Sequence, residues 1–237
     1  MDEQKPKRDF LLPASIMIAG VLITVALFYN AGKNADNRTT NQPSASAGEQ
    51  ESPLAKMKPV SEKDHLFGNP DAPVKVVEFS DLECPFCKDF HATMHRVVNA
   101  YGDRVAWVYR QFPIPQLHPK APLEAQAAEC ADKLGGNEKF WSFMDRIFEV
   151  TPSNNGLAVE ELPKIAGEIG LDVKQFNSCL SSNYGQDRIQ DDMLDAVNAG
   201  ARGTPYSVVV NESGERFVIN GALSFEQVSA IINQALK

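Results

Sequence analysis

The stretch "FSDLECPFCKDF", residues 79–90, places Cys84 and Cys87 directly after an apolar run and at the start of a predicted helix. Metal centres, structural disulfides and redox-active pairs all use the C-x-x-C spacing of these two cysteines. The spacing alone therefore leaves three uses open, and the rest of the chain has to separate them.

The segments around this stretch have the pattern of a strand, a helix and a second strand. Residues 74–79 are rich in β-branched and aromatic side chains, as a buried strand is. Residues 84–101 repeat apolar side chains at helical spacing, and residues 104–112 again favour a strand. This order predicts the parallel crossover of an α/β domain.

The C-terminal half has a helical block followed by two strands and a helix. Residues 119–200 have helical spacing throughout, with a first helix predicted to stop at Gly135. The segments "PYSVVV" and "RFVIN" are joined by "NESGE", which is typical of a hairpin, and Ser224 is the predicted N-cap of the closing helix. The order is therefore βαβ, a helical block, then ββα.

This pattern resembles the thioredoxin superfamily, and within it the DsbA-like branch. The matching segments are "GNPDAPVKVVEFSDLECPFC" at 68–87, "QFP" at 111–113, "AAECA" at 127–131 and "GTPY" at 203–206. The resemblance covers residues 63–237 and implies a thioredoxin-like α/β fold with a helical insertion at about 117–200. It also implies that the cysteine pair exchanges disulfides.

Cys84 is predicted to be the reactive cysteine. It occupies the N-cap position of the predicted helix, and Pro85 occupies the first helical position, where a missing N–H costs nothing. The positive helix end and its unpaired N–H groups stabilise a thiolate, which predicts a lowered pKa for Cys84. Lys88 is expected to lower this pKa further, and Asp81 and Glu83 are expected to oppose it.

Cys87 lies inside the same helix and is predicted to be the more buried, resolving cysteine of the pair. An inert structural bridge between the two is disfavoured, because a loop of two residues contributes little closure entropy. A shared zinc site with His91 and His95 is excluded, since Cys84 and His95 would lie about 16 Å apart along one helix. The histidines are expected on a solvated helix face, no bound metal is predicted, and cuprous copper on the two thiols alone stays open.

Glu78 is predicted to relay protons. It lies in the otherwise apolar run "VVEF", six residues before Cys84, so its carboxyl group can reach the space beneath the helix start. Burial there would raise its pKa and let it exchange a proton with Cys87. The resembled families place an acidic residue at this offset, although alternation along a strand leaves open a Glu78 that faces solvent.

Residues for substrate binding are implied by the resemblance. The family holds the proline of "GTPY" in the cis form against the disulfide, where Thr204 and Pro205 present a backbone edge to a substrate strand. Pro85 and Phe86, between the two cysteines, are expected to contact substrate as well. An ordinary trans turn at Thr204 and Pro205 is the alternative.

Cys130 and Cys179 lie on two predicted helices of the insertion and are expected to form a structural disulfide. Closing a loop of about fifty residues would stabilise the insertion by about 4 kcal/mol in the chain-entropy model. Two buried free thiols are the alternative.

The N-terminal region predicts a membrane anchor. Residues 11–29 carry no charge and are long enough to cross a bilayer, and the basic residues before them keep residues 1–10 in the cytoplasm. A cleavable signal peptide is the alternative, but a small-x-small cleavage site is lacking at the end of the run. Residues 30–62 have the composition of a flexible linker.

These features together predict a membrane-anchored thiol–disulfide oxidoreductase whose catalytic domain lies on the extracytoplasmic side. It would act on cysteines of exported polypeptides, need no dissociable cofactor and be recycled by a membrane redox partner. Nucleic acid is excluded as a partner by the net charge of −8. The resemblance favours oxidation of substrates; a reductase or isomerase, and a non-enzymatic copper-handling module, are the alternatives.

Overall fold

The computed structural model describes residues 53–237. The predicted cytoplasmic N-terminus, the anchor at residues 11–29 and most of the linker lie outside this range. Within residues 53–237, every helix is too short or too polar to cross a membrane.

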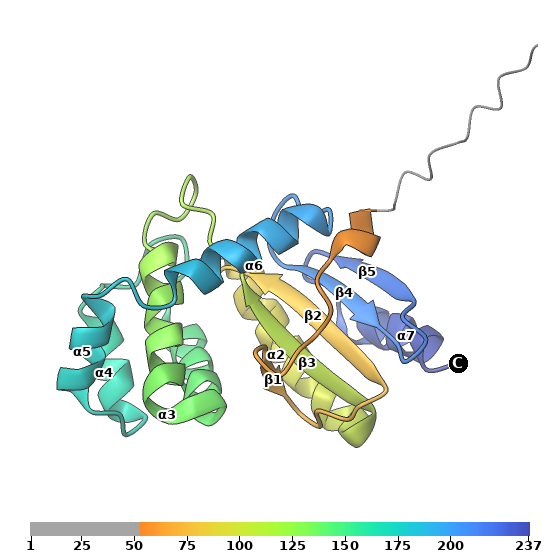
Figure 1. Cartoon of the computed structure of the whole chain (residues 1–237), viewed down its shortest axis with the longest axis horizontal. Coiled ribbons are helices and arrows are strands. Elements are labelled where there is room, and N and C mark those ends of the chain that lie inside the picture. Colours follow the sequence, from red (N-terminus) through yellow and green to blue (C-terminus); the bar gives the residue numbers. More distant parts are fainter. Residues whose placement is uncertain (1–52) are drawn as a thin grey trace, which may run out of the picture. The chain divides into compact units, whose positions relative to one another are not determined.

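A five-stranded mixed sheet forms the centre of the domain (Figure 1), in the order β1-β3-β2-β4-β5. Strands β2 and β3 are parallel and are joined through helix α2, whereas every other neighbouring pair is antiparallel. The elements are β1 His65–Phe67, β2 Val74–Ser80, α2 Pro85–Tyr101, β3 Val105–Gln111, β4 Tyr206–Val210 and β5 Arg216–Asn220. The predicted thioredoxin-like arrangement is therefore confirmed, with the edge strand β1 as an unpredicted addition.

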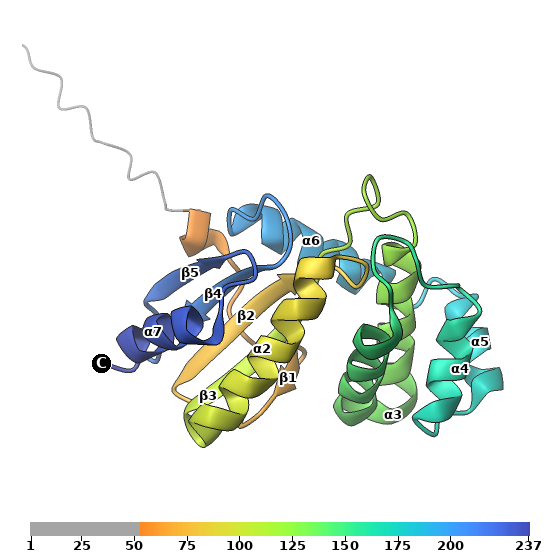
Figure 2. The same cartoon turned by 180° about the vertical axis from the view of Figure 1, so that it is seen from behind.

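Helices cover both faces of the sheet. Helices α2 and α7 (Phe225–Ala235) lie on one face and α6 (Gln186–Asn198) lies on the other (Figures 1 and 2). The alternating side chains of β2 serve both layers: Val74 and Val76 join the core beneath α2, and Val77 and Phe79 join the core beneath α6.

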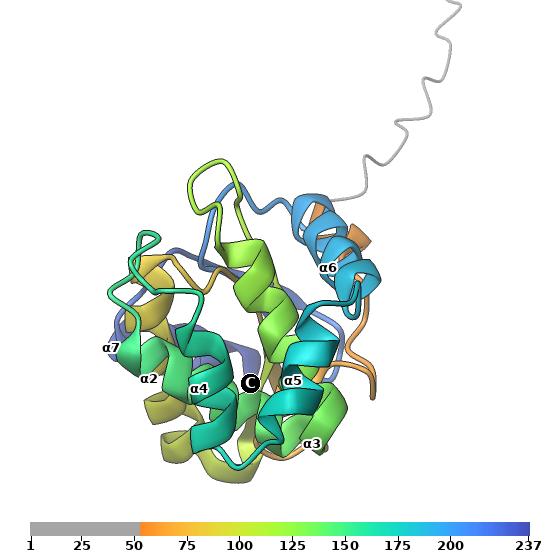
Figure 3. The ribbon, with the colours of Figure 1, turned by 90° about the vertical axis from the view of Figure 1, so that its left-hand side faces the viewer.

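The helical insertion consists of α3 (Ala121–Val150), α4 (Glu161–Glu168) and α5 (Val173–Leu180), which pack side by side (Figure 3), together with α6. The predicted stop at Gly135 is confirmed to within one residue, because Gly136, with φ 70° and ψ −171°, is non-helical and divides α3 into two helical segments. A positive φ is accessible to glycine without steric cost, so the chain can turn there and begin the second segment.

A disulfide joins Cys130 of α3 to Cys179 of α5, with 5.8 Å between their Cα atoms. Both residues belong to the same buried cluster as Phe143 of α3 and Phe176 of α5, whose ring centroids lie 5.8 Å apart. The insertion is thus held by a covalent bond as well as by apolar packing.

The prediction that the linker extends to residue 62 is wrong at its C-terminal end. A 3-10 turn, η1 (Pro53–Lys56), is followed by Met57, which is buried in the core beneath α6. The backbone N–H of Lys58 donates to Asp195 of α6 at 2.7 Å. This segment is therefore part of the folded domain.

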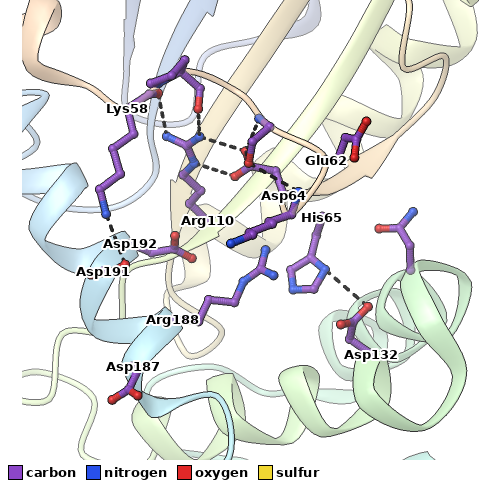
Figure 4. Close-up of a pocket in the computed structure, with 14 residues that line it drawn as sticks. Lys58, Glu62, Asp64, His65, Arg110, Asp132, Asp187, Arg188, Asp191 and Asp192 are labelled. Atoms are coloured by element: carbon purple, nitrogen blue, oxygen red, sulfur yellow. Dashed lines mark hydrogen bonds and ion pairs between the residues drawn. The ribbon is translucent and has the colours of Figure 1, made fainter.

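Arg110 of β3 fixes this N-terminal segment to the sheet (Figure 4). Its buried guanidinium donates to the Asp64 carboxylate at 2.8 and 3.1 Å and to Asp195 at 2.6 Å. It also donates to the carbonyl oxygens of Lys58 and Pro59 at 3.2 and 3.1 Å. Two carboxylates and two carbonyls compensate the buried charge, as such a group requires.

Candidate active site

Cys84 lies at the N-terminus of α2. It is the N-cap residue, with φ −77° and ψ 121°, and Pro85 follows at the first helical position. The Cys84 carbonyl accepts the N–H groups of Cys87 and Lys88, both at 3.1 Å, which starts the helix. Cys84 retains 6% of its surface exposed and Cys87 none, so solvent reaches the pair only at Cys84.

The two thiols have opposite pKa shifts. A hydrogen bond from the Cys87 thiol, with backbone N–H groups of Phe86 and Cys87, lowers the pKa of Cys84 to about 6. Burial, together with the nearby Cys84 sulfur, raises the pKa of Cys87 well above its usual value. Near neutral pH, Cys84 is therefore mostly a thiolate and Cys87 a thiol, which is the distribution a nucleophile and its resolving partner need.

Lys88 does not contribute to the Cys84 thiolate as predicted. Its Nζ donates to the carbonyl oxygen of Thr151 at 2.6 Å, in the loop that follows α3. The ammonium group is thus used to hold that loop against α2. The helix start and the Cys87 thiol account for the low pKa of Cys84 without it.

Asp81 and Glu83, which were expected to oppose the thiolate, position loops around it instead. The Asp81 carboxylate accepts the N–H of Ile114 at 2.8 Å and lies 3.0 Å from His118 Nδ1, so it holds the loop between β3 and α3. Glu83 accepts the backbone N–H of Asn155 in the loop after α3. Both loops rise at the same end of the domain as the start of α2 (Figure 2).

Glu83 also faces a second carboxyl group, on Glu124 of α3. Burial, followed by the hydrogen bond and charge of Glu83, raises the pKa of Glu124 to about 9. The inner oxygens, Glu83 Oε1 and Glu124 Oε2, are buried without an ordinary donor. Glu124 is therefore protonated near neutral pH and can donate a hydrogen bond to the Glu83 carboxylate.

The Thr204–Pro205 loop faces the cysteine pair. The peptide bond between these residues is cis, and the Cys84 thiol donates to the Thr204 carbonyl oxygen at 3.4 Å. This contact exists only while Cys84 is protonated, because a carbonyl oxygen accepts and cannot donate. Ionisation or oxidation of Cys84 therefore frees the Thr204 carbonyl for another donor.

Phe86 gives the cysteine pair an exposed apolar neighbour. It lies between the two cysteines and keeps 63% of its surface exposed. Leu117, on the loop held by Asp81, is exposed as well and was not predicted from the sequence. An exposed apolar side chain beside a reactive group can contact an incoming substrate.

Glu78 lies beneath the start of α2, fully buried. Side chains alternate along β2, and Glu78 points to the same face as Val74 and Val76, which pack toward α2. The structure therefore shows which face of the strand Glu78 occupies, which the sequence left open. Burial raises the pKa of Glu78 to about 8, partly opposed by a 2.9 Å hydrogen bond from Trp107 Nε1. Glu78 also adds to the raised pKa of Cys87, which places the two groups within electrostatic reach of each other.

The expectation that His91 and His95 lie on a solvated helix face is wrong for His91, whereas His95 is partly exposed. His91 is 6% exposed, and its ring packs against Trp107 and Phe148, with centroids 5.0 and 4.6 Å away. The reason is that α3 packs along this side of α2. Both histidines contact Asp145 of α3.

A sheet of this order, interrupted by a helical insertion and carrying a thiol pair opposite a cis-proline loop, is that of a DsbA-like protein of the thioredoxin superfamily. The sequence profile of the family described as Thioredoxin matches residues 60–234, so the chain belongs to that family.

Solved structures agree with this assignment. DsbA2 of Pseudomonas aeruginosa superposes with a TM-score of 0.63 at 28% identity, covering 75% of this chain and 96% of DsbA2. A thioredoxin-like oxidoreductase from Silicibacter pomeroyi gives 0.63 at 26% identity, covering 78% and 96%. BdbD of Bacillus subtilis, at 22% identity and a TM-score of 0.66, covers 76% and 96% and shares the fold.

Curated relatives match over a smaller part of their length. The Na(+)/H(+) antiporter NhaA 3 of Salinispora tropica is 31% identical over 224 residues, which is 93% of this chain and 32% of the antiporter. NhaA 1 of Mycolicibacterium gilvum is 32% identical over 155 residues, 64% of this chain and 24% of the antiporter. The chain thus spans about a quarter to a third of these relatives.

Proposed function

We propose that this protein catalyses thiol–disulfide exchange on exported polypeptides, in the direction that oxidises them. The observation that carries the proposal is the opposite pKa shift of Cys84 and Cys87 at the start of α2. One sulfur is ionised and accessible, and the other is protonated and buried. Disulfide exchange needs this asymmetry.

The oxidising reaction starts from a bridge between Cys84 and Cys87. A substrate thiolate attacks the Cys84 sulfur, a mixed disulfide forms, and the bridge breaks with its electron pair on Cys87. A second substrate thiolate then attacks the substrate sulfur of the mixed disulfide and releases Cys84 as a thiolate. The substrate has lost two electrons to the cysteine pair, and a membrane redox partner must remove them.

Glu78 fits the role of proton donor to Cys87. With a pKa of about 8 it is mostly protonated near neutral pH, and it lies in the same buried space as the sulfur that leaves as a thiolate. Because Cys87 has a raised pKa, it takes up a proton as the bridge opens. A neighbouring carboxyl group can supply that proton where solvent has no access.

Substrate binding is assigned to the surface around Cys84. Pro205 and Thr204 border the cysteine pair, and the Thr204 carbonyl is released when Cys84 loses its proton. An extended substrate can therefore donate a backbone N–H to this carbonyl. Pro85 and the exposed Phe86 supply apolar contact area beside it.

The low pKa of Cys84 also supports the oxidising direction. With a pKa of about 6 instead of 9, thiolate formation stabilises the reduced pair at pH 7 by about 1.4 kcal/mol, equivalent to about 30 mV. Stabilising the reduced pair makes the bridge a stronger oxidant. Cuprous binding is disfavoured by the same asymmetry, because a metal needs both sulfurs deprotonated.

We further propose that residues 11–29 anchor the protein in the cell membrane, with the domain outside the cytoplasm, where thiols can be oxidised. Alkaline carbonate extraction of membranes tests this proposal. The full chain should stay in the membrane pellet, and a shortened chain in the soluble fraction would contradict an anchor.

The exchange mechanism is tested by trapping. In Cys87→Ser, Cys84 keeps its activating helix end, but Cys87 can no longer attack the mixed disulfide and release the substrate. Substrates should therefore accumulate on Cys84 as reductant-sensitive heavier species. Cys84→Ser is the matched control and should trap far fewer partners, because Cys87 is fully buried. Equal trapping by both variants, or trapping by neither, would refute the assigned roles.

A further inference from the structure

Three side chains that disulfide exchange does not use converge on one point between α2 and α3. His91 Nε2 and His95 Nε2 lie 2.8 and 2.7 Å from the same oxygen, Asp145 Oδ1, and 3.2 Å from each other. Among the residues that the structure describes, this is the group of histidine, cysteine and acidic side chains whose ligand atoms meet closely enough to hold a metal ion.

The spacing of these atoms matches that of ligands around one small cation. Two ligands of a tetrahedral zinc ion lie about 3.3 Å apart, because each metal–ligand bond is about 2.0–2.1 Å long. The three observed separations are 3.2, 2.8 and 2.7 Å. A rotation of the side chains that moves the atoms apart by about half an ångström is enough to admit the ion.

Hydrogen bonding alone satisfies this arrangement poorly. For both rings to donate to Asp145 Oδ1, each Nε2 must carry a hydrogen, and the two N–H groups then face each other at 3.2 Å. A cation between the rings replaces two crowded donors with two lone pairs that both point at the same charge.

The group is rigid on one side and accessible on the other. Spacing i and i+4 places His91 and His95 on one face of α2, and Trp107 lies behind both rings, with centroids 5.0 and 5.4 Å away. On the outer side a hollow of about 490 Å³ opens to solvent, lined also by Lys88, Ala92, Phe148 and Glu149. A cation can enter there, and water can complete its coordination.

We propose that His91 Nε2, His95 Nε2 and Asp145 Oδ1 form a binding site for a divalent transition-metal ion of the zinc class, with a fourth position open to solvent. Two imidazoles and one carboxylate are ligands that suit zinc, and hard cations such as calcium prefer sites made of oxygen alone. The site is separate from the cysteine pair and joins α2 to the insertion.

Cobalt quenching of tryptophan fluorescence tests the proposal, with the full-length, untagged protein in its oxidised form, so that Cys84 and Cys87 offer no thiolates. Both tryptophans of the chain, Trp107 and Trp141, pack on the His91 ring, at 5.0 and 6.4 Å. Cobalt(II) should therefore quench the emission saturably, and zinc added afterwards should displace it and restore the signal.

Variants separate this site from adventitious binding. Asp145→Asn and His95→Gln keep the size and polarity of the side chains and should each weaken cobalt and zinc binding at least about a hundredfold. Glu149→Gln is the matched control, because it alters a carboxylate of the same hollow that lies outside the ligand group. It should bind as the wild type does.

Thermal unfolding gives a second measurement that needs no fluorescence. Zinc should raise the midpoint of the wild type and of Glu149→Gln, and should leave the two ligand variants unchanged. Absence of saturable binding to the wild type, or binding that survives both Asp145→Asn and His95→Gln, would overturn the proposal. In either case the three side chains only clamp α2 to α3, and the exchange mechanism is unaffected.

Discussion

Replacing Cys87 by alanine should raise the pKa of Cys84 while leaving the helix start intact. The hydrogen bond from the Cys87 thiol is the largest cause of the low Cys84 pKa, ahead of a hydrogen bond from the Thr204 side chain and those from the backbone N–H groups. A hydrogen bond to a charged group is worth about 1.5–3 kcal/mol, and one pKa unit corresponds to about 1.4 kcal/mol. Its loss should move the pKa from about 6 to between about 7 and 8.

The assay is ultraviolet absorbance of the thiolate as a function of pH, supported by the rate of alkylation of Cys84. At pH 6 the ionised fraction should fall from about one half to a tenth or less. Cys87→Ser is the matched control, since its hydroxyl can donate the same hydrogen bond and should keep the pKa near its wild-type value.

An unchanged pKa in Cys87→Ala would refute this reasoning. It would show that the backbone N–H groups of Phe86 and Cys87 stabilise the thiolate by themselves. A pKa that rises equally in both variants would contradict it in another way, because the geometry of the helix start, not the hydrogen bond, would then have changed.

Two further predictions concern buried groups outside the thiol pair. The pKa of Glu78 is raised from 4.5 to about 8 by burial, so the folded state keeps a proton that the unfolded state loses, and stability falls as pH rises through this window. Glu78→Gln removes this dependence. In urea unfolding, the free energy of unfolding of the variant should therefore rise relative to that of the wild type by up to about 1.4 kcal/mol per pH unit. Parallel curves of unfolding free energy against pH would contradict the burial argument. Replacing both Cys130 and Cys179 by alanine should lower the free energy of unfolding by about 4 kcal/mol without abolishing exchange at Cys84, and an unchanged urea midpoint would contradict a stabilising bridge.

Elements that extend over a long patterned run could be predicted from the sequence. Short elements, and order that depends on contacts between residues far apart in the chain, could not. The regions of β2 and β3 follow from runs of β-branched and aromatic residues, and α2 follows from apolar residues at helical spacing. Strand β1 has only three residues, too few for a pattern to show. The segment around Lys58 resembles a linker locally, and its order comes from contacts with Asp195, 137 residues away in the chain.

The candidate site likewise has features that could be predicted from local sequence and features that could not. The positions of Cys84 and Pro85 depend on local helix-start chemistry, which the sequence contains. Burial of His91 and the contact that turns Lys88 away from Cys84 both depend on how α3 and the loop after it pack on α2. Such packing joins residues more than fifty positions apart, and periodicity carries no information about it.

The core of the domain is continuous across its two parts. Val76 of the sheet, Cys87 of α2, Phe143 of α3 and Phe176 of α5 all belong to one buried cluster. The insertion therefore cannot be removed or exchanged between relatives as an independent module, since its removal would expose the apolar side of the active-site helix to solvent. Substitutions in the core of the insertion have to be matched by substitutions in the sheet and α2, so the two parts are expected to evolve as a single unit.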